Sequence, residues 1–314
     1  MIKNPIEYNS LYKVLEAFPD EKACIEHLDA LRWPNGVVCP LCGSSRKIYA
    51  VERNHGYKCA DCKKQFSVRK GTIFEESRLP LRKWFAAAWL VTNSRKGISS
   101  CHLAREIGVT QKTAWFMLGR LREVAGAIST SAGPLDGVVE TDETYLGGKE
   151  KNKHLNKKLG AGRGTVGKQI VIGSHDREGN KVIAVGIPST DKPQIHDYIR
   201  SNISPGSVLY TDDHKSYRGL KDYDHSVIRH SVGEYVRGKV HTNGIESFWA
   251  LLKRGYYGVF HHFSAKHLHR YLVEFETRWN EADLTPSERL NSMLKSSPDC
   301  RLTYERLIDD GNNA

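Results

Sequence analysis

The sequence predicts an α/β protein: a mixed β-sheet flanked by helices, preceded by a zinc ribbon and a helix-turn-helix region. Three observations support this fold class: two C-x-x-C pairs, a helical pattern broken by a tight glycine turn, and a later change to strands that alternate with helices. At roughly 100–200 residues per domain, the 314 residues allow two or three domains. The expected parts are a helical segment 1–35, a zinc ribbon 36–76, a helix-turn-helix region 77–132, an α/β domain 133–290 and a C-terminal tail 291–314.

Composition points to a polyanionic partner and away from a membrane. The formal net charge is +11, and the stretch from Leu146 to Lys168 holds seven Lys and Arg residues against one acid. Such clustering favours nucleic acid, although a solvated loop would look the same. The expected DNA-contacting residues in this stretch are Lys151, Lys153, Lys157, Lys158 and Arg163. No apolar run approaches the ~18 residues of a membrane span, and we expect a cytoplasmic, nucleoid-associated protein.

The cysteines predict a structural metal site. Cys39 and Cys42 form one C-x-x-C pair, and Cys59 and Cys62 form a second pair 16 residues further on. Two such pairs can close a tetrahedral shell of four thiolates around Zn²⁺, and a closed shell has no position for substrate. Gly43 follows the first pair, where the turn needs a positive φ. The zinc is therefore expected to be structural.

A helix-turn-helix is expected between residues 98 and 122. Leu103, Ala104 and Ile107 share one face of the first helix, Gly108 supplies the turn, and Thr110 can cap the second helix. An ordinary helical hairpin is the alternative. In a helix-turn-helix, the start of the second helix would contact DNA through Gln111, Lys112 and Thr113.

The α/β region begins after a short linker, Gly133 to Gly137. Its predicted strands are Val138–Thr144, Gln169–His175, Lys181–Ile187, Ser207–Asp212 and Ser226–His230. Asp176 to Gly179 reads as the turn of a hairpin between the second and third strands. The predicted helices are Lys192–Asn202, Gly244–Tyr257 and Ser264–Asn280.

Three acids occupy positions that suit metal-dependent phosphoryl chemistry. Asp142 lies in the first strand, Asp212 ends a later strand, and Glu246 lies 34 residues beyond Asp212 on a helix. That helix places Ile245, Phe248, Trp249 and Leu252 in one sector and Asn243, Glu246, Lys253 and Arg254 in another. Two Mg²⁺ or Mn²⁺ ions held by such hard oxygen ligands can promote phosphodiester cleavage. Any one of these acids alone would read as a solvated surface group.

These motifs together resemble a bacterial insertion-sequence transposase of the IS1595 (ISXO2-like) group. The resemblance rests on the stretches Val139–Gly148, Tyr210–Asp212 and His241–Arg254 and on the ribbon residues Cys59–Val68 and Gly71–Phe74. It implies an RNase H-like catalytic domain whose acidic (DDE) triad binds two divalent ions. The triad maps onto Asp142, Asp212 and Glu246, with Lys253 as the accompanying cation.

The third triad member is ambiguous, because members of this group are described with either Asn or Glu there. Asn243 lies one helical turn before Glu246. Glu246 is preferred because a carboxylate is the better hard ligand, and Asp213 is a second choice beside Asp212.

The expected function is DNA transposition: recognition of terminal inverted repeats, metal-dependent cleavage and strand transfer, by a homodimer that holds two DNA ends. Two alternatives stay open. One is a catalytically idle DNA-binding regulator derived from a transposase, and the other is an RNase H-like nuclease without strand transfer.

Overall fold

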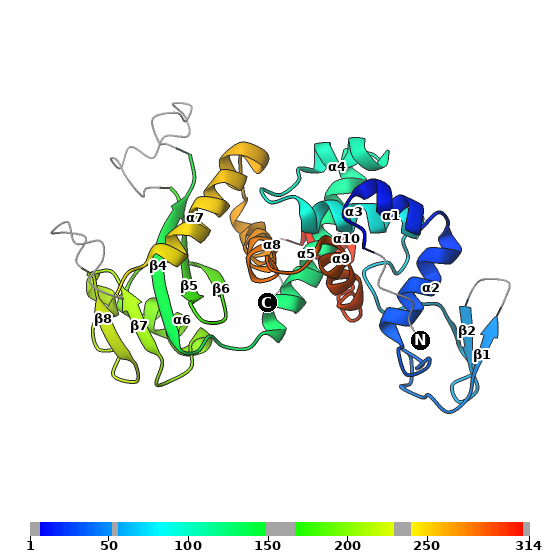
Figure 1. Cartoon of the computed structure of the whole chain (residues 1–314), viewed down its shortest axis with the longest axis horizontal. Helices are drawn as coiled ribbons and strands as arrows, with labels where there is room; N and C mark the ends of the chain where they lie inside the picture. Colours follow the sequence, from blue (N-terminus) through cyan, green and yellow to red (C-terminus); the bar gives the residue numbers. More distant parts are fainter. Residues whose placement is uncertain (1–6, 52–55, 149–166, 229–239, 310–314) are drawn as a thin grey trace. The chain divides into compact units, whose positions relative to one another are not determined.

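The computed structural model describes residues 7–51, 56–148, 167–228 and 240–309 (Figure 1). By its internal contacts the chain divides into two compact units. Unit 1 comprises Met1–Ile128 and Asp283–Ala314, and unit 2 comprises Ser129–Ala282. The C-terminal helices thus belong to the same unit as the cysteine pairs.

Unit 1 contains a small antiparallel sheet that carries the second cysteine pair. Its strands are β1 (Ile48–Val51), β2 (Gly56–Cys59) and β3 (Gln65–Phe66), in that spatial order. The ribbon's buried centre is lined by Cys39, Cys59 and Phe66, with Trp33 and Tyr57 packed against it.

Most of unit 1 is helical, and its helix starts follow from the sequence. The helices are α1 (Leu11–Ala17), α2 (Glu21–Arg32), α3 (Leu81–Asn93), α4 (Ser100–Ile107), α5 (Gln111–Ser131, which runs into unit 2), α9 (Pro286–Lys295) and α10 (Tyr304–Ile308). Ser10 and Asp20 cap α1 and α2, and Pro80 precedes α3. A capping box between Thr285 and Glu288 begins α9, which packs on α2 and α3.

Unit 2 is built on a mixed sheet of five strands among the described residues (Figure 1). The strands are β4 (Val138–Leu146), β5 (Gln169–Asp176), β6 (Lys181–Ile187), β7 (Val208–Thr211) and β8 (Asp224–Val227). Their spatial order is β6-β5-β4-β7-β8. Strands β4, β5 and β6 pair antiparallel, whereas β4, β7 and β8 pair parallel. The predicted strands and the β5–β6 hairpin are confirmed. The last strand begins two residues earlier than predicted and ends at Val227, and the predicted residues 229–230 lie outside the described residues.

Helices cover both faces of this sheet. On one face α7 (Asn243–Gly255) and α8 (Leu268–Asn280) bury a core that includes Phe248, Trp249 and Phe275. On the other face α6 (Lys192–Asn202) packs over Val139, Ile172 and other apolar side chains. Alternate residues of each strand face the two cores, as the pleat requires. Short helical turns, η4 (Lys215–Tyr217), η6 (Tyr256–Phe260) and η7 (Ala265–His267), complete the unit.

Candidate functional site

Three carboxylates converge where strand β4 extends beyond the end of β7. β4 pairs with β7 only from Val138 to Glu140, and Asp212 comes directly after the last residue of β7. Asp142 and Glu143, further along β4, therefore lie beside the chain as it leaves β7. Ligand oxygens of Asp142, Glu143 and Asp212 all lie within 4.8 Å of one another.

Burial and the charges of neighbouring acids make Asp142 and Glu143 hard to ionise. The pKa of Asp142 is raised to about 6, mainly by burial and also by the negative charges of Asp212 and Glu246, despite the hydrogen bonds that the carboxylate accepts. The pKa of Glu143 is raised to about 8, again mainly by burial and then by its two acidic neighbours. Within the described part of the chain, Glu143 Oε1 is buried and makes no hydrogen bond of ordinary geometry, although the Tyr217 hydroxyl is close enough to lower the pKa of Glu143.

This donor set suits a divalent cation. Mg²⁺ and Mn²⁺ prefer carboxylate oxygens, and a cation among them would offset the repulsion that raises the two pKa values. The buried, unpartnered oxygen of Glu143 would gain a partner at the same time. The three side chains thus fit a metal site.

Helix α7 packs on the sheet with the face expected from its sequence. Ile245, Phe248, Trp249 and Leu252 are buried. The indole Nε1 of Trp249 donates a hydrogen bond to Asp142 Oδ2 over 3.1 Å. This contact ties the middle of α7 to the acidic cluster.

The two candidates for the third triad member lie at the start of α7. Asn243 and Glu246 are exposed, and Glu246 Oε1 accepts a hydrogen bond from the Thr242 hydroxyl over 3.0 Å. Among the described residues, the group within 4.8 Å includes neither Glu246 nor Asp213. Glu246 is nevertheless close enough for its charge to raise the pKa of Asp142. Lys253 lies half-buried in the last turn of α7.

Sequence reasoning missed two acids in strand β4. Because side chains alternate along a strand, Glu143 would be expected on the opposite face of the sheet from Asp142. It lies in the cluster because β7 ends before β4 does, so that the chain leaving β7 with Asp212 passes beside this part of β4. Glu140, two residues before Asp142, is almost fully buried under the start of α7. The two further acids beside Asp142 within the Val138–Leu146 segment were the available signals.

In unit 1 the four cysteines of the two pairs lie together as predicted. The Sγ atoms of Cys39 and Cys62, and those of Cys42 and Cys59, are 3.7 Å apart. Four thiolates at Zn–S distances of about 2.3 Å in tetrahedral array would be about 3.8 Å apart. Gly43 has the expected positive φ, +73°. The geometry supports a structural zinc ion.

The predicted helix-turn-helix region forms two consecutive helices, α4 and α5. Leu103, Ala104 and Ile107 are buried, and Gly108 ends α4 in the left-handed conformation. The Thr110 hydroxyl accepts a hydrogen bond from the Thr113 N–H over 3.2 Å. Gln111 and Lys112 are exposed and Thr113 is half-buried. The basic residues expected to contact DNA, from Lys151 to Arg163, lie outside the described residues.

The fold and site define a class: a four-cysteine ribbon and a helical region joined to an α/β unit with a half-buried cluster of acids that could hold a metal ion. Comparison with known proteins gives the family. The model of the ISXO2-like transposase domain matches residues 134–280, and that of the transposase zinc-ribbon domain matches residues 19–65. The chain belongs to the IS1595 (ISXO2-like) family of insertion-sequence transposases, which confirms the resemblance inferred from its motifs.

Two relatives carry the same likeness. An uncharacterized protein in transposable element ISH50 of Halobacterium salinarum is 31% identical over 255 residues, which cover 76% of this chain and 84% of that protein. An uncharacterized transposase-like protein of Haemophilus influenzae is 31% identical over 106 residues, covering 33% of this chain and 85% of that protein. Across the residues that the structure describes, no helix is both long and apolar enough to cross a membrane.

Proposed function

We propose that this chain is an active DNA transposase: it binds the terminal inverted repeats of its element, cleaves phosphodiester bonds at the repeat boundary and joins the freed 3′ end to target DNA. The observation that carries the proposal is the cluster of Asp142, Glu143 and Asp212, within 4.8 Å, inside the segment that matches the transposase domain. Acids with raised pKa values that lie this close together are expected where carboxylates bind metal.

The sheet supports an RNase H-like assignment of unit 2. Two parallel neighbours, β7 and β8, follow an antiparallel meander of β4, β5 and β6, with β4 at the centre. Asp142 lies on the central strand and Asp212 at the carboxyl end of its parallel neighbour. In open α/β sheets, ligands bind at the edge formed by the carboxyl ends of adjacent parallel strands, where Asp212 lies.

In the proposed site, Asp142, Glu143 and Asp212 would hold a divalent ion, and an α7 residue would contribute to holding a second ion. Glu246 is our choice for that residue, with Asn243 the alternative and Asp213 a second choice beside Asp212. Mg²⁺ or Mn²⁺ would activate the attacking oxygen and stabilise the leaving oxygen. Trp249 holds Asp142 in orientation through its hydrogen bond.

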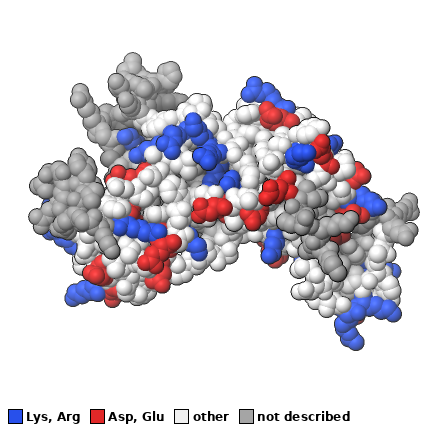
Figure 2. All heavy atoms as spheres, viewed as in Figure 1, with Lys and Arg blue, Asp and Glu red and all other residues white. Residues whose placement is uncertain are grey.

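Positive charge near the site suits a DNA backbone. Lys253 and Arg254 lie in the last turn of α7, and on the face drawn in Figure 2 basic side chains gather over the later turns of this helix. Such charge binds phosphates and makes binding salt-dependent. We assign Lys253 as the cation that contacts the phosphate beside the metal site.

Recognition of the repeat is assigned to unit 1 and to the basic stretch that precedes β5 in the sequence. The zinc ribbon and the exposed start of α5, with Gln111, Lys112 and Thr113, would read the DNA, together with the basic stretch that holds Lys151, Lys153, Lys157, Lys158 and Arg163. A homodimer would hold the two ends of one element. These assignments suit a cytoplasmic protein at the nucleoid.

The test is a cleavage and joining assay with purified protein and labelled duplex that carries the element's own terminal repeat, with Mg²⁺, Mn²⁺ or EDTA. We expect nicks at the repeat boundary only with metal, and loss of cleavage with retained binding in Asp142→Asn. Comparison of Glu246→Gln with Asn243→Ala identifies the third ligand. Tight binding without cleavage under either metal would instead indicate a regulator, and cleavage without joining would indicate a nuclease.

A further inference from the structure

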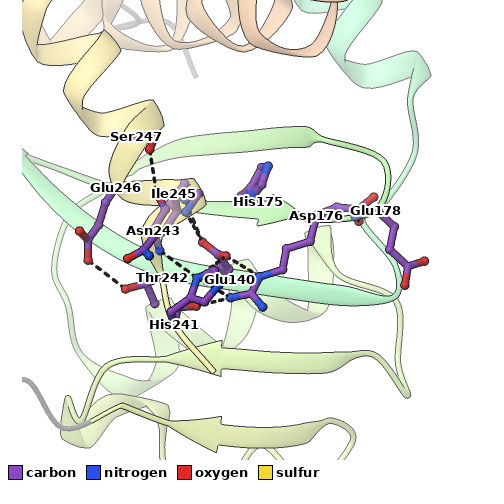
Figure 3. A network of polar contacts seen from close by, with 12 residues as sticks. Glu140, His175, Asp176, Glu178, His241, Thr242, Asn243, Ile245, Glu246 and Ser247 are labelled. Carbon is purple, nitrogen blue, oxygen red and sulfur yellow. Dashed lines mark hydrogen bonds and ion pairs between the residues drawn. The ribbon is translucent and has the colours of Figure 1, made fainter. Parts of the chain in front are cut away.

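The first turn of α7 is capped by a carboxylate from the sheet. Glu140 on β4 has only 1% of its surface exposed, and its Oε2 accepts hydrogen bonds from the backbone N–H groups of Gly244 (2.7 Å) and Ile245 (3.0 Å). The residue at the usual capping position, Thr242, makes no capping bond with its side chain. Glu140 therefore satisfies N–H groups that a helix start leaves open, and its negative charge complements the helix dipole (Figure 3).

A second group holds Glu140 in place. Arg177, in the turn after β5, donates from Nε to Glu140 Oε1 over 2.5 Å. Nη2 of Arg177 donates to both Nδ1 and the carbonyl oxygen of His241, each over 2.7 Å. A guanidinium has no acceptor, so His241 Nδ1 must accept. Arg177 thus joins the strand carboxylate to the chain that leads into α7.

The close approach of α7 to the strand requires a glycine. A Cβ at position 244 would lie 2.2 Å from His175 Nδ1 and 2.9 Å from Glu140 Oε2. No side chain fits there unless the helix start or its neighbours move. The hydrogen bonds to Glu140 therefore depend on the absence of a side chain at Gly244.

The contact between Glu140 and the start of α7 affects the acidic cluster, because Glu140 and the cluster residue Asp142 belong to the same strand. Glu140 lies two residues before Asp142 on the same strand and the same face. The helix start that Glu140 fixes carries Asn243 and Glu246, and Figure 3 shows Glu246 directed away from Glu140. A second contact, from Trp249 to Asp142, fixes the middle of the helix.

We propose that Glu140 is a positioning residue: held by Arg177, it fixes the start of α7 on β4 and so sets the distance between the α7 metal ligand and the pair Asp142 and Asp212. This inference rests on the proposed function, since it gives the anchored helix a ligand to position. Groups that orient metal ligands in this way commonly account for about 10–100-fold in metal affinity or activity.

Glutamine at position 140 separates positioning from packing. Glu140→Gln keeps the shape and one acceptor oxygen, but it removes the negative charge and presents an NH₂ group to one of two donors, Arg177 or the helix start. The matched control is Glu178→Gln, which removes the same charge from an exposed side chain in the adjoining turn. Gly244→Ala is a second variant that leaves Glu140 and Arg177 unchanged and forces the helix start outward.

The experiment uses the full-length, DNA-free, zinc-loaded protein. Mn²⁺ binding is followed by calorimetry, exchange of the amide hydrogens of residues 244 and 245 by mass spectrometry, and the thermal midpoint by circular dichroism. We expect Glu140→Gln and Gly244→Ala to weaken Mn²⁺ binding about 10–100-fold. Both should also speed exchange at these amides, with Glu178→Gln like wild type. A purely structural role would lower the thermal midpoint and leave Mn²⁺ affinity of the folded protein unchanged.

Wild-type Mn²⁺ affinity in Glu140→Gln would overturn the proposal, and so would wild-type affinity in Gly244→Ala if the glutamine variant does not fold. Failure of the proposed function has a different signature. In that case wild type and Asp142→Asn bind Mn²⁺ equally, whereas amide exchange still reports whether Glu140 anchors α7.

Discussion

At the scale of single residues, Glu143 combines burial, an unpartnered oxygen and two acidic neighbours. Because the pKa of Glu143 is raised to about 8, this side chain must take up a proton when the metal-free chain folds at neutral pH, and glutamine would remove that cost. We expect Glu143→Gln to raise the thermal midpoint of the metal-free protein and to weaken Mn²⁺ binding at least about tenfold. Thermal unfolding and calorimetry on the same samples test both halves. A variant that loses stability and keeps its Mn²⁺ affinity would exclude Glu143 as a ligand.

Glu276 on α8 is a second buried acid, and it is not part of the cluster of Asp142, Glu143 and Asp212. Its oxygens accept hydrogen bonds from the Ser129 hydroxyl (2.5 Å) and the Ala184 N–H (2.9 Å). Burial raises its pKa from 4.5 to about 7 despite these bonds. The raised pKa means that the folded protein holds this proton more tightly than the unfolded chain does.

The stability linked to Glu276 is therefore fully present below pH 4.5 and is lost as pH rises through about 7. The loss is on the order of 3 kcal/mol at 1.36 kcal/mol per unit of pKa. We expect Glu276→Gln to make unfolding less dependent on pH and to be more stable than wild type at pH 8, but not at pH 5. Urea unfolding at both values measures this. Parallel curves for the two proteins would contradict the assignment.

At the scale of elements, the packing of α7 on β5 depends on a glycine opposite Asp142. Gly173 pairs with Asp142 across the sheet, and a Cβ there would lie 2.5 Å from the Trp249 ring. We expect Gly173→Ala to displace the indole and to cost about 1–3 kcal/mol of unfolding free energy. It should also lower cleavage, because Asp142 loses its hydrogen-bond donor.

Gly258→Ala is the matched control for this substitution. Position 258 lies in the turn η6 and shows no positive φ, and a Cβ added there would have no heavy atom within 4 Å. Its unfolding free energy should stay within about 0.5 kcal/mol of wild type. Equal effects of the two alanines would mean that the contact with Trp249 does not position α7.

Periodicity predicted the elements of unit 2 well, because each strand and helix buries a face that repeats at its own spacing. The buried face of α7, from Ile245 to Leu252, is an example. The contacts at element ends were not predictable in this way. Glu143 joins Asp212 because β7 ends before β4 does, and Glu140 meets α7 because two segments about a hundred residues apart come together. Neither contact produces a repeating pattern in the sequence from which it could be predicted.

At the scale of the whole molecule, the zinc ribbon of unit 1 and the α/β unit 2 are stabilised in different ways. Unit 2 has buried apolar cores on both faces of its sheet. The ribbon of unit 1 has a small core around Cys39, Cys59 and Phe66, so a zinc ion would contribute much of its stability. Spacing alone predicted its ligands, because two C-x-x-C pairs specify a four-thiolate shell.

Removal of one thiolate tests this dependence. We expect wild type to contain about one zinc ion per chain, and Cys62→Ser to lose the zinc and the binding of terminal-repeat DNA. Cys101→Ser, a change at an exposed cysteine outside the group of four, should keep both. Elemental analysis and gel-shift assays measure the two properties. Full zinc content in Cys62→Ser would show that the four cysteines are not the ligands.

The central claim is that the cluster formed by Asp142, Glu143 and Asp212 binds the divalent ions used for DNA cleavage. Its most direct test is Mn²⁺ binding to the zinc-loaded protein, followed by electron paramagnetic resonance, in wild type, Asp142→Asn and Asp212→Asn. The account predicts bound Mn²⁺ in wild type and its loss in both variants, with each variant still folded. Equal Mn²⁺ binding by all three proteins would contradict it.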